Sequence, residues 1–393
     1  MSISERCASM TPFLVMEILE AAQAMERAGH SVIHLEVGEP DFDTPDCVKR
    51  ASCKALDDNQ THYTHSLGLL ELRQAIAADH KKRYGVTVDP ANIAVTQGTS
   101  PAMLAVFSTI LEAGDQVISS DPCYACYDNF ITFAGAEPVK VTVTEDDAFQ
   151  YRVANIKKTL DENDRVKAIL INSPANPTGS LLSAKRMQAI AELAEERGLW
   201  IVSDEIYNGL VYEGDEHSIL EFSDRAFVLN GFSKLYAMTG WRLGYIIAPA
   251  AFMRTLQTVC QNFFISANTM AQWGGVAALT DPESEKDVAR MKATYDKRRQ
   301  YMLKRLKGMG FNIKHDPTGA FYVLVNMRHL AKAFEGSSLK LAYDILEKAH
   351  IGCTPGIDFG PGAEGFIRFS YANSMENIEE AMNRLEQYLA DRG

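Results

Sequence analysis

The sequence predicts an α/β protein with a large domain built on a mostly parallel central sheet and a smaller α+β domain. Three observations carry this prediction. From about residue 46, short apolar stretches alternate with helical patterns, which is typical of a parallel sheet covered on both faces. After Ala250 the alternation gives way to consecutive helical patterns. The length of 393 residues also exceeds what one hydrophobic core usually supports.

Three segments are expected along the chain. Residues 1–45 form an N-terminal segment that packs with the small domain, 46–284 form the large domain, and 285–393 form a bridging helix and the small C-terminal domain. The bridge is predicted from the long charged helical pattern over 285–308.

The elements of the first half follow from hydrophobic periodicity and from turn residues. An amphipathic helix over 15–25 is ended by Gly29, and a short strand over 32–37 runs into a loop rich in glycine and proline. Helices are expected over 46–57, 69–84, 102–111 and 183–197, and apolar strands over 93–96, 116–119, 167–171 and 199–203.

The second half begins with two buried strands, 226–230 and 243–248, that flank a turn-rich stretch. Beyond them the pattern is mainly helical until the small domain. Helices are expected over 251–260, 269–279, 285–308, 339–350 and 375–391, and strands over 321–326 and 365–371.

Composition narrows the class of protein. Hydrophobic residues make up 46% and charged residues 23%, which is ordinary for a soluble globular chain. The net charge of −12 argues against nucleic acid as a main partner, because phosphate backbones recruit basic surfaces. No apolar run is long enough to span a bilayer, and residues 1–6 lack the features of a signal peptide, so a cytoplasmic location is expected.

The seven cysteines are scattered, as expected for reduced thiols rather than a disulfide framework. Cys123 and Cys126 have C-x-x-C spacing, but no second Cys or His pair accompanies them. His62 and His65 likewise lack a third ligand. No metal site is predicted.

Polar side chains follow several of the predicted strands. They are Thr99 and Ser100, Asn176, Asp204 with Tyr207, and Ser233-Lys234 with Arg242 a short turn later. Because the carboxyl ends of parallel strands share one edge of the sheet, these groups can converge. The turn at Thr99 and Ser100 has the strand–turn–helix form that offers N–H groups to a phosphate, and it is also a plain helix cap; both readings can hold together.

Lys234 and Arg242 suggest a specific ligand chemistry. A desolvated lysine can lose its proton and attack a carbonyl, and an arginine can hold a phosphate. Pyridoxal phosphate has both an aldehyde and a phosphate. Taken alone, the 233–242 stretch is equally compatible with a surface ion pair.

Five motifs in one order make the chain resemble the class I aminotransferases, the aspartate aminotransferase-like fold type I pyridoxal phosphate enzymes. They are LEVGEPDF (35–42), NSPANPTG (172–179), SDEIY (203–207), SK with MTGWR (233–242) and IRFSYA (367–372). The resemblance covers nearly the whole chain. It implies that the large domain binds pyridoxal 5′-phosphate and that the protein is a homodimer with shared active sites.

The resemblance also implies roles for individual residues. Lys234 is the residue linked to the cofactor and the proton shuttle, Asp204 pairs with the pyridine nitrogen, and Tyr207 and Asn176 hold the phenolic oxygen. Tyr124 stacks on the ring. The phosphate ligands are Thr99, Ser100, Ser233 and Arg242, with Tyr63 reaching the phosphate of the partner subunit.

Substrate binding is implied at Arg368, which clamps the α-carboxylate with help from Asn176 and the Gly38 backbone. Two positions depart from the family pattern: Tyr124 stands where tryptophan is frequent, and Thr99 where glycine is frequent. Both departures still allow stacking and backbone contact with a phosphate. From the residues alone, Tyr124 could be core packing and Arg368 could pair with a structural acid.

The implied function is a PLP-dependent aminotransferase that moves an amino group from an L-amino acid to a 2-oxo acid, with 2-oxoglutarate the expected acceptor, by a ping-pong mechanism. The donor is not readable from the sequence. No second arginine for a dicarboxylate is evident, and Phe13, Leu14, Phe264 and Ile265 are apolar candidates near the pocket.

Three alternatives remain. A β-eliminating lyase of the same fold would use the same Lys234 and Asp204. A nicotinamide-dependent dehydrogenase would need a G-x-G-x-x-G turn, which the 97–101 stretch does not supply. A cofactor-binding regulator would need a DNA-binding domain, for which the acidic chain leaves no room.

Overall fold

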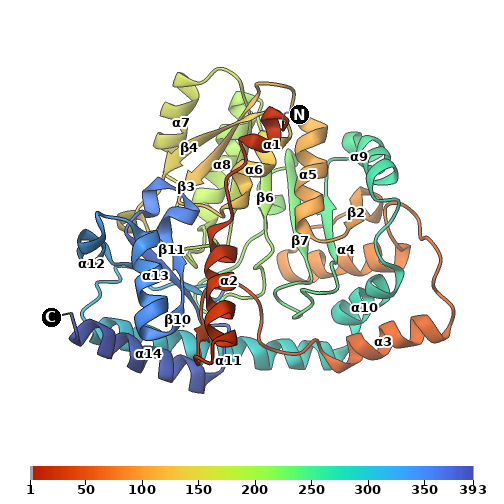
Figure 1. Cartoon of the computed structure of the whole chain (residues 1–393). Helices are drawn as coiled ribbons and strands as arrows, with labels where there is room; N and C mark the ends of the chain where they lie inside the picture. Colours follow the sequence, from red (N-terminus) through yellow and green to blue (C-terminus); the bar gives the residue numbers. More distant parts are fainter. Residues whose placement is uncertain (1–2, 393) are drawn as a thin grey trace.

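The central sheet of the large domain organises the molecule (Figure 1). The computed structural model describes residues 3–392; Met1, Ser2 and Gly393, which belong to the predicted segments 1–45 and 285–393, lie outside the described residues. Among the described residues, seven strands form this sheet in the order β2-β8-β7-β6-β5-β3-β4. They are β2 (Ile93–Thr96), β3 (Gln116–Asp121), β4 (Glu137–Thr142), β5 (Val166–Asn172), β6 (Trp200–Asp204), β7 (Ala226–Gly231) and β8 (Gly244–Ile247).

Neighbouring strands of this sheet are parallel, except that β8 is antiparallel to both β2 and β7. The prediction of a mostly parallel central sheet is therefore confirmed. Side chains alternate between the two faces: on β5, Ala168 and Leu170 belong to one apolar cluster and Ile169 to the other. Because both faces are covered, the strands are apolar almost throughout rather than alternating with polar residues.

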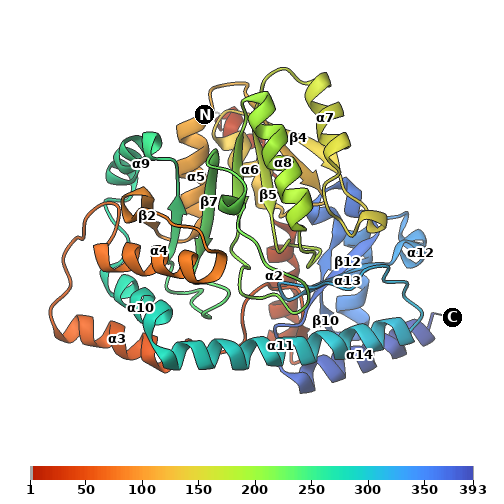
Figure 2. The same ribbon diagram turned by 180° about the vertical axis from the view of Figure 1, so that it is seen from behind.

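Helices cover both faces of the sheet (Figures 1 and 2). On one face pack α5 (Thr99–Ile110), α6 (Cys126–Phe133) and α9 (Ala250–Phe263). On the other pack α3 (Asp46–Asp57), α4 (Leu70–Tyr84), α7 (Val153–Glu162), α8 (Ala184–Arg197) and α10 (Thr269–Thr280). Across the part of the chain that the structure describes, no helix is long and apolar enough to cross a membrane.

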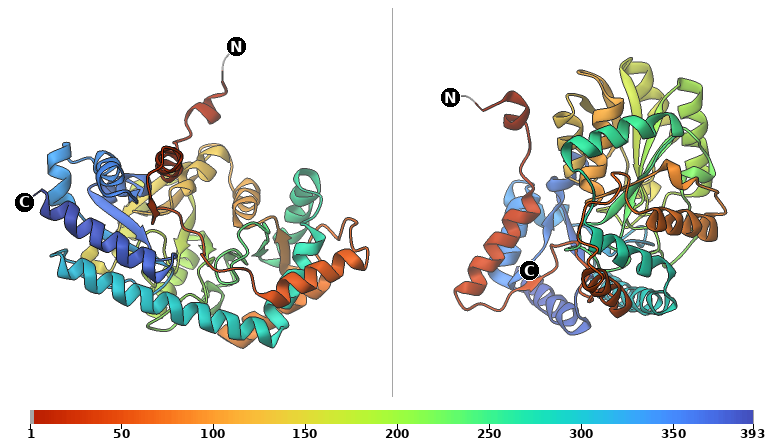
Figure 3. Two further views of the ribbon diagram at one scale, coloured as in Figure 1. Left: turned by 60° about the horizontal axis from the view of Figure 1, so that its bottom comes forward. Right: turned by 90° about the vertical axis from the view of Figure 1, so that its right-hand side faces the viewer.

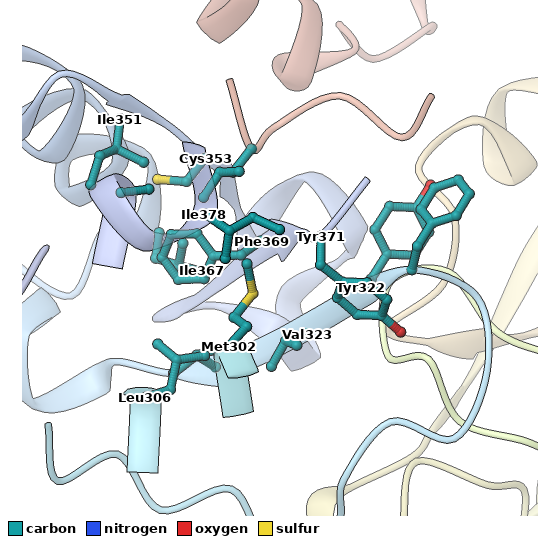
Figure 4. Close-up of a cluster of buried hydrophobic side chains, with 14 of the residues drawn as sticks. Met302, Leu306, Tyr322, Val323, Ile351, Cys353, Ile367, Phe369, Tyr371 and Ile378 are labelled. Atoms are coloured by element: carbon teal, nitrogen blue, oxygen red, sulfur yellow. The ribbon is translucent and has the colours of Figure 1, made fainter. Parts of the chain in front are cut away.

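The small domain has its own apolar core, part of which is drawn in Figure 4. A three-stranded sheet in the order β11-β12-β9 lies here, and β1 pairs with β10 in parallel. The N-terminal segment therefore adds a strand beside the C-terminal part of the chain. The elements are α2 (Leu14–Arg27), β1 (Ile33–His34), β9 (Tyr322–Asn326), α12 (Arg328–Ala331), α13 (Ser338–Ala349), β10 (Ile351–Gly352), β11 (Thr354–Pro355), β12 (Phe366–Ser370) and α14 (Met375–Ala390).

A long helix, α11 (Pro282–Gly308), runs along one side of the molecule from α3 to α14 (Figure 2). It begins three residues before the predicted start, because Asp281 accepts a hydrogen bond from the N–H of Glu283 at 2.8 Å and Pro282 occupies the first turn. The short helix α1 (Glu5–Ala8) stands off from the body at the N-terminal end (Figure 3).

Several elements differ from the sequence-based expectation. The strand expected over 32–37 is reduced to Ile33–His34, and α5 begins at Thr99 rather than at 102. Sequence periodicity did not identify α6, β4 or α7. Their local patterns are weak because α6 is rich in aromatic residues and β4 carries Pro138 and polar residues on the outermost strand of the sheet.

A partly buried charge cluster is centred on His34 of β1. His34 Nδ1 lies 2.6 Å from Glu36 Oε1, and its Nε2 lies 3.2 Å from Glu26 Oε1. The hydrogen bond and charge of fully buried Glu36, reinforced by Glu26, raise the pKa of His34 to about 9. The His34 pair therefore contributes stability that is complete below the ordinary histidine pKa of about 6.5 and is lost as pH rises through 9.

We expect His34→Gln to destabilise the protein at pH 6 and to have progressively less effect toward pH 9. The destabilisation should shrink by up to about 1.4 kcal/mol per pH unit in this window. Urea unfolding of both proteins across this range measures the difference. His315→Gln, at an exposed histidine, is the control. A destabilisation by His34→Gln that is independent of pH would contradict this account.

Candidate active site

A cavity of about 330 Å³ lies at the carboxyl ends of the large-domain strands, against the small domain. Asp204 ends β6, the 231–234 turn follows β7 and the 98–100 turn follows β2, so the sheet topology alone brings them to one edge. The residues predicted to bind the cofactor or the α-carboxylate line this cavity, with the exception of Tyr63: Gly38, Thr99, Ser100, Tyr124, Asn176, Asp204, Tyr207, Ser233, Lys234, Arg242 and Arg368.

Lys234 is the half-buried amine of the cavity. Its Nζ donates a hydrogen bond to the Gly38 carbonyl oxygen at 2.6 Å. Burial lowers the pKa of Lys234 to about 8; the nearby charge of Glu39 opposes this, and those of Arg368 and Arg242 reinforce it. A lysine with this pKa is partly neutral near pH 7, which is the form that can attack a carbonyl or accept a proton.

Asp204 is a buried carboxylate held by two donors. Its Oδ2 accepts from the Tyr127 hydroxyl at 2.7 Å, and its Oδ1 accepts from the Ile206 N–H at 3.2 Å. Burial raises the pKa of Asp204 to about 6, while these two hydrogen bonds favour the ionised form. The carboxylate is therefore suited to accept a hydrogen bond from a buried N–H cation.

Tyr127 was not identified from the sequence, although it fixes Asp204. Its signal is its place three residues after Tyr124, which puts both rings on one side of a helical turn; the ring centroids lie 5.3 Å apart, edge to face. The spacing of the two tyrosines is informative only if a helix is predicted here. The helix α6 is too short to show a clear helical pattern in the sequence.

Tyrosine and asparagine side chains form the polar wall beside the lysine. The Tyr207 and Tyr322 hydroxyls lie 2.7 Å apart, and the Asn176 N–H donates to Asn172 Oδ1 at 2.9 Å. A Cβ on Gly38 would lie 1.9 Å from the Tyr322 hydroxyl oxygen. Only glycine therefore fits at position 38 with Tyr322 in place. Tyr322 and Asn172 line the cavity, and neither was identified from the sequence.

The start of α5 forms an anion-binding corner of the cavity. Its cap residue is Gly98, with φ of +101°, and no side chain caps the helix. The first N–H groups of α5 are therefore left for a ligand, and Thr99 and Ser100 line the cavity beside them. Arg242 lies so close that a Cβ on Gly98 would be 2.7 Å from its guanidinium nitrogen. Unpaired helix N–H groups, hydroxyls and a guanidinium fit a phosphate group.

Arg368, on β12, brings a guanidinium from the small domain and is only 4% exposed. It donates to Asn176 Oδ1 at 2.8 Å, to Thr354 Oγ1 at 3.0 Å and to the Glu36 carbonyl oxygen. Its Cζ lies 4.3 Å from the centroid of the Tyr322 ring. None of these partners is a carboxylate, so among the described residues the alternative of a structural acid finds no support. A buried guanidinium without a carboxylate partner can bind the carboxylate of a ligand.

Some of the remaining predicted residues line the cavity and others do not. Tyr124 lines the cavity and meets the Phe13 ring edge to face at 5.9 Å. Phe13 also lines the cavity, whereas Leu14, Phe264 and Ile265 do not. Tyr63 lies between α3 and α4 and is 79% exposed, outside the cavity of its own chain.

The donor set as a whole fits pyridoxal phosphate. An amine with a lowered pKa, a buried carboxylate, tyrosine and asparagine groups, an aromatic wall and an anion-binding corner all face one cavity. Each corresponds to one functional group of that cofactor: aldehyde, ring nitrogen, phenolic oxygen, ring face and phosphate.

Comparison with known proteins agrees with this geometry. A family model described as aminotransferase class I and II matches residues 30–385. The (5-formylfuran-3-yl)methyl phosphate transaminase of Methanocaldococcus jannaschii is 41% identical over 98% of this chain and 99% of that protein. The aspartate aminotransferase of Pyrococcus horikoshii is 38% identical over 98% of this chain and 97% of that protein. Among solved structures, the aspartate aminotransferase of Thermus thermophilus with maleate matches with a TM-score of 0.93 at 34% identity, over 98% of this chain and 99% of that one.

Proposed function

The chain belongs to the family of class I and II aminotransferases, and from this premise we propose how its own residues divide the work of amino transfer. The protein is a pyridoxal-phosphate-dependent aminotransferase, with amino acids and 2-oxo acids as substrates. The cofactor supplies an aldehyde that takes up the amino group and a cationic ring that stabilises negative charge at the substrate α-carbon. The observation that carries the proposal is that the Lys234 amine shares one cavity with Asp204 and Arg368.

We propose that Asp204, kept ionised by Tyr127, holds the pyridine nitrogen. Tyr207 and Asn176 hold the phenolic oxygen, and Tyr124 covers one face of the ring. The phosphate is held by Thr99, Ser100, Ser233 and Arg242. The proposal is supported by the uncapped start of α5 beside Arg242 and by the two hydrogen bonds on Asp204.

Lys234 is the proposed proton carrier. Its neutral amine would remove the proton from the substrate α-carbon and would then carry that proton within the cavity. The pKa of about 8 leaves enough neutral amine near pH 7 for this role. Arg368 binds the α-carboxylate through its fork of N–H groups and so fixes the α-carbon beside the amine, with help from Asn176 and the Gly38 backbone.

We further propose that residues 1–45, 46–284 and 285–393 act as N-terminal segment, large domain and bridging helix with small domain. Arg368 belongs to the third of these and Lys234 to the second, so closure of the small domain would bring the guanidinium onto the substrate and exclude water. We also propose a cytoplasmic homodimer in which the exposed Tyr63 of one subunit contacts the phosphate of its partner.

We propose 2-oxoglutarate as the amino acceptor, with its α-carboxylate bound by Arg368 as for the amino donor. Incubation with a panel of L-amino acids and 2-oxoglutarate, with glutamate measured as product, tests this function. Borohydride treatment should attach the pyridoxyl group irreversibly to Lys234, as located by peptide mass. Release of pyruvate and ammonia from a cysteine conjugate without glutamate formation would instead favour the β-eliminating lyase.

Replacement of Arg368 by glutamine should raise KM for every carboxylate substrate alike. The loss of a charged hydrogen bond, worth about 1.5–3 kcal/mol, corresponds to an increase of roughly 10- to 150-fold. Steady-state kinetics with two donors and two acceptors measure it. Arg328→Gln is the control, because Arg328 lies in the same domain, its side chain donates to the Glu364 and Gly362 carbonyls, and it does not line the cavity. A loss confined to one amino acid would contradict the proposed clamp.

A further inference from the structure

One part of the cavity lining is apolar. Phe13, Val15, Met16 and Val37 form this part, and the Tyr124 ring joins it through its edge-to-face contact with Phe13 at 5.9 Å. We call this set the apolar wall. Its residues come from the N-terminal segment and from the loop before α6, so the central sheet does not supply it.

The segment that carries the wall, residues 11–16, is fixed at both ends. The Thr11 N–H donates to Asn129 Oδ1 at 3.0 Å, and the Asn129 side-chain N–H donates back to the Thr11 carbonyl at 3.1 Å. The Leu14 N–H donates to Asp358 Oδ1 at 2.8 Å. Asn129 lies on α6 of the large domain, and Asp358 lies after β11. Phe13 therefore stands between two anchors and is a defined part of the cavity.

Within one subunit, the cavity offers no further cation for a second carboxylate. Among the described residues that line it, the cations are Lys234, Arg242 and Arg368. The proposed function already assigns these three to the amine chemistry, the phosphate and the α-carboxylate. Glu39 adds a negative charge at the mouth, where its carboxylate accepts from the Thr239 hydroxyl. A short acidic side chain would be desolvated against the apolar wall without a cationic partner.

We infer that the amino donor is an L-amino acid with a large apolar side chain, aromatic above all, and that Phe13 is a specificity-determining residue. This inference rests on the proposed function, because it assumes that Arg368 orients the substrate. An aromatic side chain gains apolar burial and edge-to-face contacts with Phe13 and Tyr124. L-Aspartate gains neither.

The inference is compatible with 2-oxoglutarate as acceptor. That acid has one methylene more than the 2-oxo acid of aspartate, and Met16, one of the wall residues, is 45% exposed. A carboxylate on the longer chain can remain hydrated at the mouth, whereas one on the shorter chain is held among the apolar side chains.

The test compares donors and a matched pair of variants. In the holoenzyme with 2-oxoglutarate, kcat/KM for L-phenylalanine should exceed that for L-aspartate by at least about tenfold, as expected when one substrate gains an apolar contact that the other lacks. Phe13→Ala should lower kcat/KM for L-phenylalanine by roughly tenfold or more and leave L-aspartate within about threefold. Leu14→Ala is the control, because Leu14 lies on the same segment and does not line the cavity.

A second measurement does not depend on turnover. The non-reacting acid 3-phenylpropionate should bind the wild-type holoenzyme more tightly than succinate does. Phe13→Ala should reduce this difference in affinity. Equal or better use of aspartate, or a Phe13→Ala effect that is the same for both donors, overturns the inference and leaves the proposed function standing. No transfer from any amino acid overturns the proposed function itself, and this inference with it.

Discussion

Replacement of Lys234 by alanine is expected to lower the rate of amino transfer by on the order of 10⁴-fold or more, because it removes both the attachment of the cofactor and the proton carrier. No other amine lines the cavity among the described residues, so no side chain can take over the proton. The measurement is the rate of glutamate formation from an amino acid and 2-oxoglutarate. The borohydride-treated variant should in addition show no pyridoxyl group at position 234.

The control for this prediction is Lys167→Ala. Lys167 lies on β5 of the same sheet but is exposed and remote from the cavity, so amino transfer should be unchanged. Full activity of Lys234→Ala with a native unfolding transition would show that Lys234 neither attaches the cofactor nor carries the proton.

Replacement of Asp204 by asparagine should give the second large effect. The variant keeps the size of the side chain and an oxygen for the Tyr127 hydroxyl, but it loses the charge that holds a protonated ring nitrogen. Loss of one such electrostatic contact in a buried site lowers kcat by about 10²- to 10³-fold. Single-turnover measurement of α-proton exchange from a deuterated amino acid isolates the affected step.

Glu205→Gln is the matched control for Asp204, since it changes the next buried carboxylate along the chain. Glu205 accepts hydrogen bonds from the Ser203 and Ser218 hydroxyls and from the Ile219 N–H, and it does not line the cavity. Its replacement should lower the free energy of unfolding and leave α-proton exchange nearly unchanged. Equal effects of the two variants on exchange would show that the charge of Asp204 has no particular role.

Much of the large domain could be predicted because its strands and helices are strongly patterned. The strand over 93–96 and the helix over 46–57 match the structure at both ends, and most other elements differ by one to three residues. The polar residues after these strands could be predicted to meet, since parallel strands end at one edge. Lys234, Asp204 and Asn176 were found in this way, and the structure places all three at the cavity.

The other part of the site depends on contacts between distant segments, and local pattern carries no information about these. The contact of Tyr127 with Asp204 depends on the position of α6 in the fold. The contact between the Tyr207 and Tyr322 hydroxyls depends on the packing of β9 against the 204–207 turn. The apolar wall needed the path of residues 11–16 across to Asn129 and Asp358. Of the four apolar residues proposed from the sequence, only Phe13 reaches the cavity.

The sequence by itself therefore determined the fold class, the cofactor and the edge of the sheet where the chemistry lies. The fold class and the edge follow from periodicity and from residue types at strand ends, and the cofactor follows from the resemblance that the five motifs carry; all of these are read from local stretches of the chain. The tertiary structure decided the electrostatic state of the site and the character of its substrate side. Burial lowers the pKa of Lys234 and raises that of Asp204, and long-range packing brings Arg368 and Phe13 to the cavity from opposite ends of the chain. Desolvation and long-range contact exist only when the chain is folded, so neither can be read from residue order.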